Sequence, residues 1–329
     1  MNNSSINMNN TLIIAKKEWK DIFRNRVFFY IMILLGILII TSVVVSILVF
    51  NSQLQEYNKS LIELSQLGLK PATPPPKLYP LNLLRGVVDY VEIIGAVLGI
   101  ILGYISISKE RNTKAMKLLL TRPVTKKEIT YGKILGNTAF IFLLMILTSI
   151  VISVSLFVIS GITLDLTELI KILLFVVIST MYIMIFFMMS FFLSIFQKNI
   201  THALILSFII WLVFVLIFPQ IGDTMDPDNQ VPGGFFKSMS IEKAQEKTIM
   251  QKFSSYETIR NGIEEASITK HYERAIFAFF GIKASYNDME LSAILADQTY
   301  NIIWIIAFFI SGFIADYLLL SKTKIYLGG

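Results

Sequence analysis

The stretch from Val27 to Phe50, VFFYIMILLGILIITSVVVSILVF, has 24 residues and no charged side chain. A helix needs about 20 apolar residues to cross the roughly 30 Å hydrocarbon core of a bilayer. The stretch is long enough for that, and it is too long for the apolar core of a cleavable signal peptide. Its sequence therefore predicts a membrane-spanning helix.

Further apolar blocks of similar length follow along the chain. They cover about 87–107, 134–159, 169–196, 200–221 and 301–320, and we expect Pro219 to close the fifth span. Of the 329 residues, 54% are hydrophobic and only 16% are charged, whereas soluble domains carry about 25% charged residues. We therefore predict an all-α integral membrane protein with six transmembrane helices.

The positions of Lys and Arg predict how the chain is oriented, because short cytoplasmic loops keep an excess of these residues. Eight cations against two acids lie between spans two and three, while the loop at 160–168 carries acids and no cation. We expect a multi-pass protein of the cell membrane with both termini in the cytoplasm and the long loops 51–86 and 222–300 outside. These flanks explain the net charge of +6, so that charge does not indicate nucleic-acid binding.

The predicted organisation follows from these spans. Residues 1–26 form a cytoplasmic N-terminus, 27–221 hold spans one to five with a cytoplasmic segment at 108–133, 222–300 form an external region, and 301–329 hold the sixth span and a tail. Residues 11–24 have an amphipathic helical pattern, with apolar residues on one face and cations on the other, namely Leu12, Ala15, Trp19, Ile22 and Phe23 opposite Lys16, Lys17, Lys20 and Arg24. This pattern predicts a helix at the membrane interface, and an ordinary cytoplasmic flank is the alternative.

The segment at 108–133 reads SKERNTKAMKLLLTRPVTKKEITYGK. Pro123 should end a first helix near Thr121, because the residue before a proline avoids the helical region. Thr125 and Glu128 match a capping box that would start the helix of the third span. An apolar ridge on the first helix could dock in a groove of a partner subunit, or it could pack on lipid or on the chain itself.

The run from about 105 to 136 resembles the signature of type-2 ATP-binding-cassette permeases, and more narrowly their multicopper-enzyme-maturation branch. The matching residues include Ser108, Glu110, 117–129 and 132–136. The resemblance implies a subunit that dimerises and binds cytoplasmic ATPase subunits, with 108–133 as the coupling segment. It implies coupling residues, together with a hinge and a cap, at Lys109, Glu110, Arg111, Met116, Leu119, Leu120, Arg122, Pro123, Thr125 and Glu128.

Two further patterns lie in the second span. Gly95, Gly99 and Gly103 share one helix face and would allow another backbone to approach closely. This face could pack within the subunit, or it could form a moving seam or a dimer contact. Asp89 and Glu92 lie near the outer end of the span, where they could begin an interfacial helix or line the mouth of a substrate path.

The two long loops differ in composition. Residues 51–86 read as a polar, helix-compatible stretch followed by a polyproline-like arm at 71–80. The external region has helical composition at about 240–274 and then an apolar patch at 275–282, which is too short to span and should re-enter the interface or pack on the helices. The region could cap an exit, dock an outer partner or be a structural insertion.

No residue pattern here indicates catalysis. The chain has no Cys and two His, and it contains no Gly-x-x-x-x-Gly-Lys-Ser/Thr loop to hold nucleotide phosphates. Together with these missing motifs, the family resemblance implies a permease subunit of an ATP-driven exporter that is not itself an enzyme and binds no cofactor. ATP and Mg²⁺ would then bind the partner ATPase, and a second permease copy, identical or different, would complete the transporter. A non-transporting membrane scaffold or sensor that binds through its external region is the alternative. The Ile-, Asn- and Lys-rich composition suggests a prokaryotic source.

Overall fold

The computed structural model describes residues 7–24, 26–66, 77, 79–112, 124–161, 163–225, 235–239, 241, 243–252 and 254–322. In these ranges the regular structure is helical, without strands. The helices are α1 (Met8–Phe23), α2 (Arg26–Gln66), η1 (Pro80–Leu84), α3 (Arg85–Tyr90), η2 (Val91–Gly95), α4 (Ala96–Asn112), α6 (Lys126–Ser160), α7 (Leu166–Phe196), α8 (Ile200–Trp211), η3 (Leu212–Ile217), α9 (Phe218–Met225), α10 (Phe235–Ser238), α11 (Lys243–Lys252), α12 (Ser254–Glu265), α13 (Ile268–Phe279), η5 (Ala284–Tyr286) and α14 (Leu291–Lys322).

Six of the described helical stretches are long and apolar enough to cross a membrane. They run from 29 to 66, 80 to 111, 126 to 158, 166 to 196, 200 to 225 and 291 to 318, so each overlaps most or all of one predicted span. The number of spans is confirmed. Most of the helices extend beyond the predicted limits, because a helix can continue past the apolar block that crosses the bilayer.

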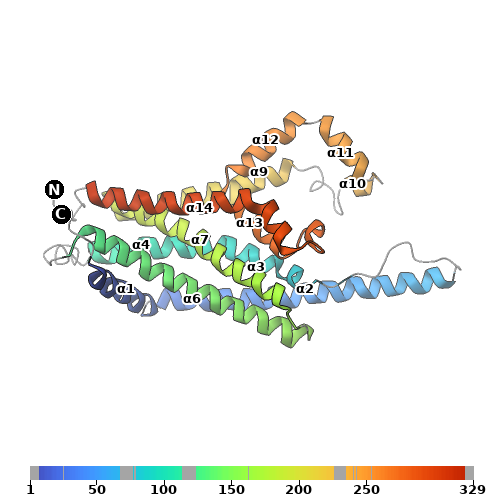
Figure 1. Cartoon of the computed structure of the whole chain (residues 1–329), viewed down its shortest axis with the longest axis horizontal. Helices are drawn as coiled ribbons and strands as arrows, with labels where there is room; N and C mark the ends of the chain where they lie inside the picture. The colour runs from blue at the N-terminus through green and yellow to red at the C-terminus, as the bar shows by residue number, and fades with distance from the viewer. Residues whose placement is uncertain are drawn as a thin grey trace.

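The long helices lie side by side along one axis (Figure 1). The end that holds the N-terminus also holds α1, the end of α4 and the start of α6, while α10 to α13 and the far end of α2 lie toward the opposite end. α4 and α7 form the centre of the bundle. In the stretch 80–111, which ends in α4, 61% of the most apolar 18 residues are buried, and in α7 the share is 67%. The corresponding share is 17% in both the α8–α9 stretch and α14. The outer helices therefore expose most of their apolar surface.

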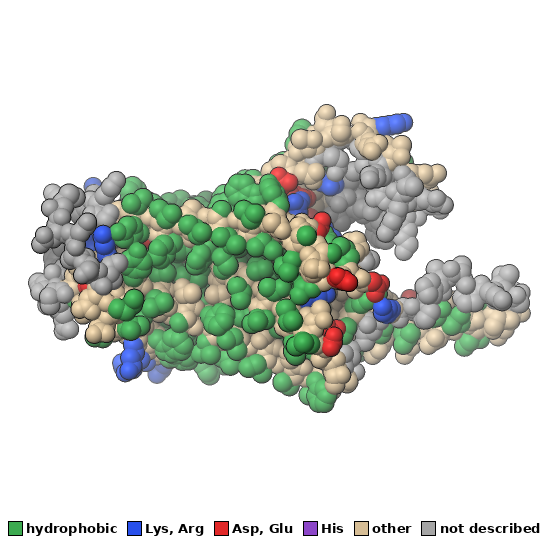
Figure 2. All heavy atoms as spheres, viewed as in Figure 1, with side chains coloured by type: hydrophobic (Ala, Val, Ile, Leu, Met, Phe, Trp, Pro, Cys, Tyr) green, Lys and Arg blue, Asp and Glu red, His purple; other side chains and the backbone are tan. Residues whose placement is uncertain are grey.

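Hydrophobic side chains cover the middle of the molecule, and charged side chains gather toward its two ends (Figure 2). Exposed apolar residues occur along the spans, for example Ile33 (45% exposed), Val154 (55%) and Ile303 (58%). Soluble monomers rarely expose apolar patches larger than a few hundred Å². The surface therefore agrees with a chain embedded in lipid.

The first long loop begins as a helix, in agreement with its helix-compatible composition. α2 continues without a break through the polar stretch at 51–66 and projects beyond the bundle (Figure 1). Residues 71–76 of the predicted arm lie outside the described residues. Pro80 does not belong to an extended arm: it begins the 3-10 turn η1, whose Leu81 and Leu84 are buried.

Pro219 does not close the fifth span, since the helix continues to Met225. Proline has no N–H to bond the carbonyl four residues earlier, and the wide turn η3, a π-helix at Leu212–Ile217, ends two residues before it. A second π-helix, η2, interrupts the second span. In each wide turn a backbone carbonyl accepts a hydrogen bond from a hydroxyl group of another segment. The Tyr182 hydroxyl donates to Glu92 O, and the Ser267 hydroxyl donates to Phe214 O.

The described part of 222–300, which the sequence predicts to lie outside the membrane, is helical where its composition predicts helices. α11 and α12 cover much of 243–265, and the apolar patch forms the end of α13 and the turn after it. Ile276 and Phe279 are fully buried, and α13 packs against α14, α7 and α3. Of the two predicted arrangements for this patch, the structure shows packing on the helices.

Candidate coupling site

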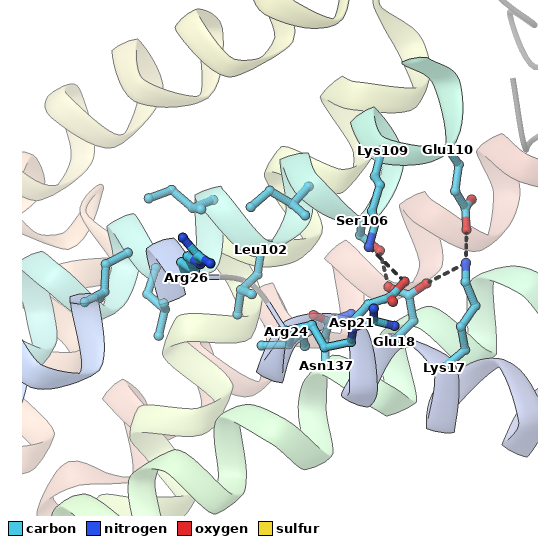
Figure 3. Close-up of a pocket in the computed structure, with 15 residues that line it drawn as sticks. Lys17, Glu18, Asp21, Arg24, Arg26, Leu102, Ser106, Lys109, Glu110 and Asn137 are labelled. Carbon is cyan, nitrogen blue, oxygen red and sulfur yellow. Dashed lines mark hydrogen bonds and ion pairs between the residues drawn. The ribbon is translucent and has the colours of Figure 1, made fainter. Parts of the chain in front are cut away.

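Four charged side chains from three helices meet at the N-terminal end of the bundle. Lys133 of α6 donates to Glu18 Oε1 of α1 at 2.7 Å and to Glu110 Oε1 of α4 at 3.0 Å. Lys17 of α1 reaches the same oxygen of Glu110 at 2.7 Å (Figure 3). We call Lys17, Glu18, Glu110 and Lys133 the charge cluster.

The ammonium group of Lys133 is buried, with only 1% of its side chain exposed. Its third acceptor is the backbone oxygen of Ser106 at 2.7 Å, so each of its three N–H groups has a partner. The hydroxyl of Ser106 in turn donates to Glu18 Oε2 at 3.2 Å. A buried charge is tolerated only when it is paired and hydrogen-bonded, and the charge cluster meets that condition for Lys133.

Two glycines bring α1 close enough to α6 for this pairing. A Cβ on Gly132 would lie 2.6 Å from Ile14 Cβ, and one on Gly136 would lie 2.7 Å from Ala15 O. Side chains at these positions would push α1 away, so the sequence Gly132-Lys133-Ile134-Leu135-Gly136 combines a close approach with the buried cation between them. In the sequence these glycines stand out only as part of a motif, and no local signal predicts their contact with α1.

The capping box at the start of α6 is present. The Thr125 hydroxyl accepts from Glu128 N at 3.2 Å, and Glu128 Oε2 accepts from Thr125 N at 2.9 Å. Glu128 also accepts from the backbone N–H of Asn7 at 2.7 Å. The same carboxylate therefore fixes the first turn of α6 to the start of α1.

Arg111 ties the end of α4 to the connection between α7 and α8. Its guanidinium donates to the backbone oxygens of Ser194 (2.9 Å), Gln197 (2.8 Å) and Lys198 (2.6 Å). Carbonyls in the last turn of a helix have no partner within the helix, and Arg111 supplies donors to them. As a result, the two ends that flank residues 113–123 are each fixed to a second part of the bundle.

A family model described as ABC-2 family transporter protein matches residues 12–323. The chain belongs to this family. The match covers all six candidate spans and the charge cluster, and it identifies a permease, the membrane component of an ABC transporter. The family match does not distinguish the multicopper-maturation branch, which stays a prediction. A comparison with curated proteins finds no match to the chain.

The predicted coupling residues of this permease fall into two groups. Lys109, Glu110 and Arg111 lie in the last turns of α4, where Lys109 forms an ion pair with Asp21 at 3.3 Å and Glu110 is 4% exposed. Their partners belong to the chain itself. The other predicted residues of the segment, Met116, Leu119, Leu120, Arg122 and Pro123, lie outside the described residues.

The glycine face of the second span packs within the permease subunit. A Cβ on Gly99 would lie 2.4 Å from Ile183 O, and one on Gly103 would lie 2.4 Å from Phe187 O, both in α7. Gly95 faces the side chain of Ile183. In this structure α7 occupies the glycine face, which is the packing within the subunit that the sequence offered as one of its arrangements.

Asp89 and Glu92 lie at the opposite end of the second span from Lys109. Glu92 is 9% exposed, and nearby Lys270 of α13 pairs with Asp223 at 3.0 Å and Glu273 at 2.9 Å. Burial lowers the pKa of Lys270, but Glu273 and Asp223 outweigh this effect and hold that pKa above its usual value. The proposed outer path through Asp89 and Glu92 stays a prediction.

A helix, α1, is observed where the sequence predicts one at 11–24, and two residues of its predicted apolar face, Ala15 and Ile22, are buried. Leu12 and Phe23 are 51% and 57% exposed, while Ile14 and Glu18 are buried against the bundle. Glu18 is a charged residue on the packed face, which the apolar pattern alone did not reveal. The membrane-interface position of α1 stays a prediction.

Proposed function

We propose that this permease is the transmembrane subunit of an ATP-driven exporter in a prokaryotic cell membrane, with both termini in the cytoplasm. ATP and Mg²⁺ would bind to separate cytoplasmic ABC ATPase subunits, and this chain would perform no catalysis. The observation that carries the proposal is the charge cluster, because it joins α1, α4 and α6 next to the segment that the family resemblance makes the coupling segment. Export, rather than import, is inferred from that resemblance.

The contacts around the segment support a mechanical role for it. α4 ends at Asn112 and α6 begins at Lys126. Arg111 holds the first of these ends on the α7–α8 connection, and Glu128 holds the second on α1. Packed interiors have low compressibility and transmit strain. A force applied by an ATPase between these ends would therefore move the attached helices together.

A second permease copy would contact another surface than the glycine face. α7 already fills that face, whereas α8 and α14 expose residues such as Ile209 and Ile310 along their lengths. Interfaces between membrane helices form by close packing in lipid. We therefore place the dimer contact among the outer helices.

Recovery of the ATPase tests the proposal. The chain is tagged and purified from its native host, and bound ATPase is measured by mass spectrometry and by MgATP hydrolysis. The triple variant Met116→Asp, Leu119→Asp and Leu120→Asp should lose the ATPase, because charge in the ridge prevents apolar docking. Ile62→Asp, at an exposed apolar position near the opposite end, should retain it. Equal recovery with both variants, or no ATPase with the unaltered chain, would refute the proposal.

The absence of Cys allows a direct test of orientation. Lys16→Cys and Ile62→Cys introduce single thiols at exposed positions of α1 and of the projecting end of α2. In intact cells a membrane-impermeant maleimide should label the thiol at 62 but not the one at 16. Permeabilised cells should give labelling at both positions, and the reverse pattern in intact cells would contradict cytoplasmic termini.

A further inference from the structure

A cavity of about 310 Å³ opens beside the charge cluster, between α1, the start of α2 and α4. Figure 3 shows its labelled lining, with Lys17, Glu18 and Asp21 on α1, Arg24 and Arg26 near the junction of α1 and α2, and Ser106, Lys109 and Glu110 on α4. Binding sites for small molecules have volumes from about 300 Å³ upward. The cavity is therefore large enough for part of a bound molecule.

One part of the lining is charged, and its acids are neutralised within the chain. Glu18 and Glu110 pair with Lys133, and Asp21 pairs with Lys109. The side chains of Arg24 and Arg26 are exposed at the cavity, and no ion pair joins either of them to an acid within the described part of the chain. The lining consequently includes two arginines whose charge no described acid neutralises.

The other part of the lining is apolar. Ile31 of α2 and Leu98, Ile101, Leu102 and Ile105 of α4 form it. From Leu98 to Ser106 the helix rises by about 12 Å, so the lining changes from apolar to charged along the direction of the span. A lipid changes from acyl chain to headgroup along the same direction.

This arrangement narrows the class of ligand. A soluble anion would leave the apolar wall without a partner, and a purely apolar molecule would leave the arginines without one. Arginine binds phosphate through two parallel hydrogen bonds, and basic pockets between membrane helices bind anionic lipid headgroups. We propose that the cavity binds one anionic glycerophospholipid, with its phosphate on Arg24 and Arg26 and an acyl chain along Ile101 and Leu98.

The residues proposed to hold the lipid, Arg24, Arg26, Leu98 and Ile101, lie outside the coupling segment 108–133, so the inference does not depend on the proposed function. The lipid would contact α1, α2 and α4 together and would add a contact between the N-terminal helix and the first span. The structure gives few other contacts between α1 and α2 compared with those between α1 and α6. We therefore expect a bound lipid to stabilise this junction.

Native mass spectrometry of the purified full chain tests the site. Phosphatidylglycerol and phosphatidylcholine of equal chain length are titrated in detergent. Phosphatidylglycerol should bind more tightly, and Arg24→Gln with Arg26→Gln should weaken its binding about 30-fold, or about 5-fold for each cation at roughly 1 kcal/mol. The matched control is Lys16→Gln with Lys20→Gln, which removes the same charge from exposed positions of α1 outside the lining and should change binding less than 3-fold.

A second variant separates a lipid from a free phosphate. Ile101→Trp fills the apolar part of the cavity and should reduce phosphatidylglycerol binding at least 10-fold, while glycerol 3-phosphate, which has no acyl chain, should not compete with the lipid. Thermal unfolding of each variant checks that it is folded. Equal binding of the two lipids, equal losses from the arginine and lysine pairs, or full competition by glycerol 3-phosphate would each overturn the proposal.

Discussion

Replacing Lys133 with Met removes the centre of the charge cluster. At 2.7 Å and an effective dielectric constant of about 20, two unit charges attract each other by about 6 kcal/mol. Glu18 and Glu110 both make such a contact with Lys133. The cost of removing three ions from water, several kcal/mol for each, offsets most of this attraction.

The single substitution nevertheless leaves two carboxylates buried, with side-chain exposures of 8% and 5%. Removing one partner of a buried ion pair typically costs about 3–5 kcal/mol. Lys17 still reaches Glu110, so we place Lys133→Met at about 3–4 kcal/mol, which corresponds to a decrease on the order of 10 °C in unfolding temperature. The triple variant Lys133→Met, Glu18→Gln and Glu110→Gln has no unpaired buried acid and should recover at least half of that loss.

Thermal unfolding of the purified permease in one detergent provides the measurement, and Lys16→Met on the exposed face of α1 is the control. The control should unfold within about 1 °C of the unaltered chain, since surface substitutions change stability by less than about 0.5 kcal/mol. If Lys133→Met is as stable as the control, or if the triple variant is less stable than Lys133→Met, the account of a buried and mutually paired cluster is wrong.

Three further substitutions test other contacts. Gly99→Ala should destabilise the permease by about 1–3 kcal/mol, because its Cβ would lie 2.4 Å from Ile183 O, whereas Gly36→Ala, with nothing within 4 Å, should not; thermal unfolding measures both, and equal effects would contradict the packing of α4 on α7. Arg111→Lys should loosen the α7–α8 connection, because an ammonium group cannot reproduce the planar fork that serves three carbonyls; faster hydrogen exchange at 197–199 is expected, and unchanged exchange would refute this. Lys270→Met should cost about 2–4 kcal/mol at pH 7. Folding raises the pKa of Lys270, so the stability that its charge contributes is fully present below the unfolded pKa of about 10.4 and is lost as the pH rises toward the folded pKa. The difference in unfolding temperature between the unaltered chain and Lys270→Met should therefore stay constant from about pH 7 to 9 and shrink above about pH 10.5. A difference that grows above that pH would contradict the raised pKa.

The sequence predicted the elements whose signal is local. An uncharged run such as 27–50 predicts a span by its length alone, and Thr125 with Glu128 predicts a helix start because a capping box involves residues three positions apart. Both features are present. The polar stretch at 51–66 gave no equally clear signal, since a helix that leaves the bilayer no longer needs apolar residues.

The contacts between distant residues could not be predicted in this way. Glu18 and Lys133 are 115 positions apart, and nothing in either local pattern shows that the two side chains meet. One signal was available: Glu18 interrupts an otherwise apolar face formed by Ile14 and Ile22, and an acid in such a position needs a buried cation. The mistake at Pro219 has a similar cause, because the wide turn that accommodates a proline depends on contacts such as that of Ser267 with Phe214.

The two wide turns, η2 and η3, give the second and fifth spans a property that uniform helices lack. Each contains an extra residue relative to the α-helical repeat, and shifting such a turn along the helix rotates the residues it passes by about 100°. The hydroxyl groups of Tyr182 and Ser267 stabilise the two wide turns at their present positions in the helices, since each donates to a carbonyl within the turn. Loss of either hydrogen bond would allow the part of the span on one side of its wide turn to rotate relative to the part on the other side.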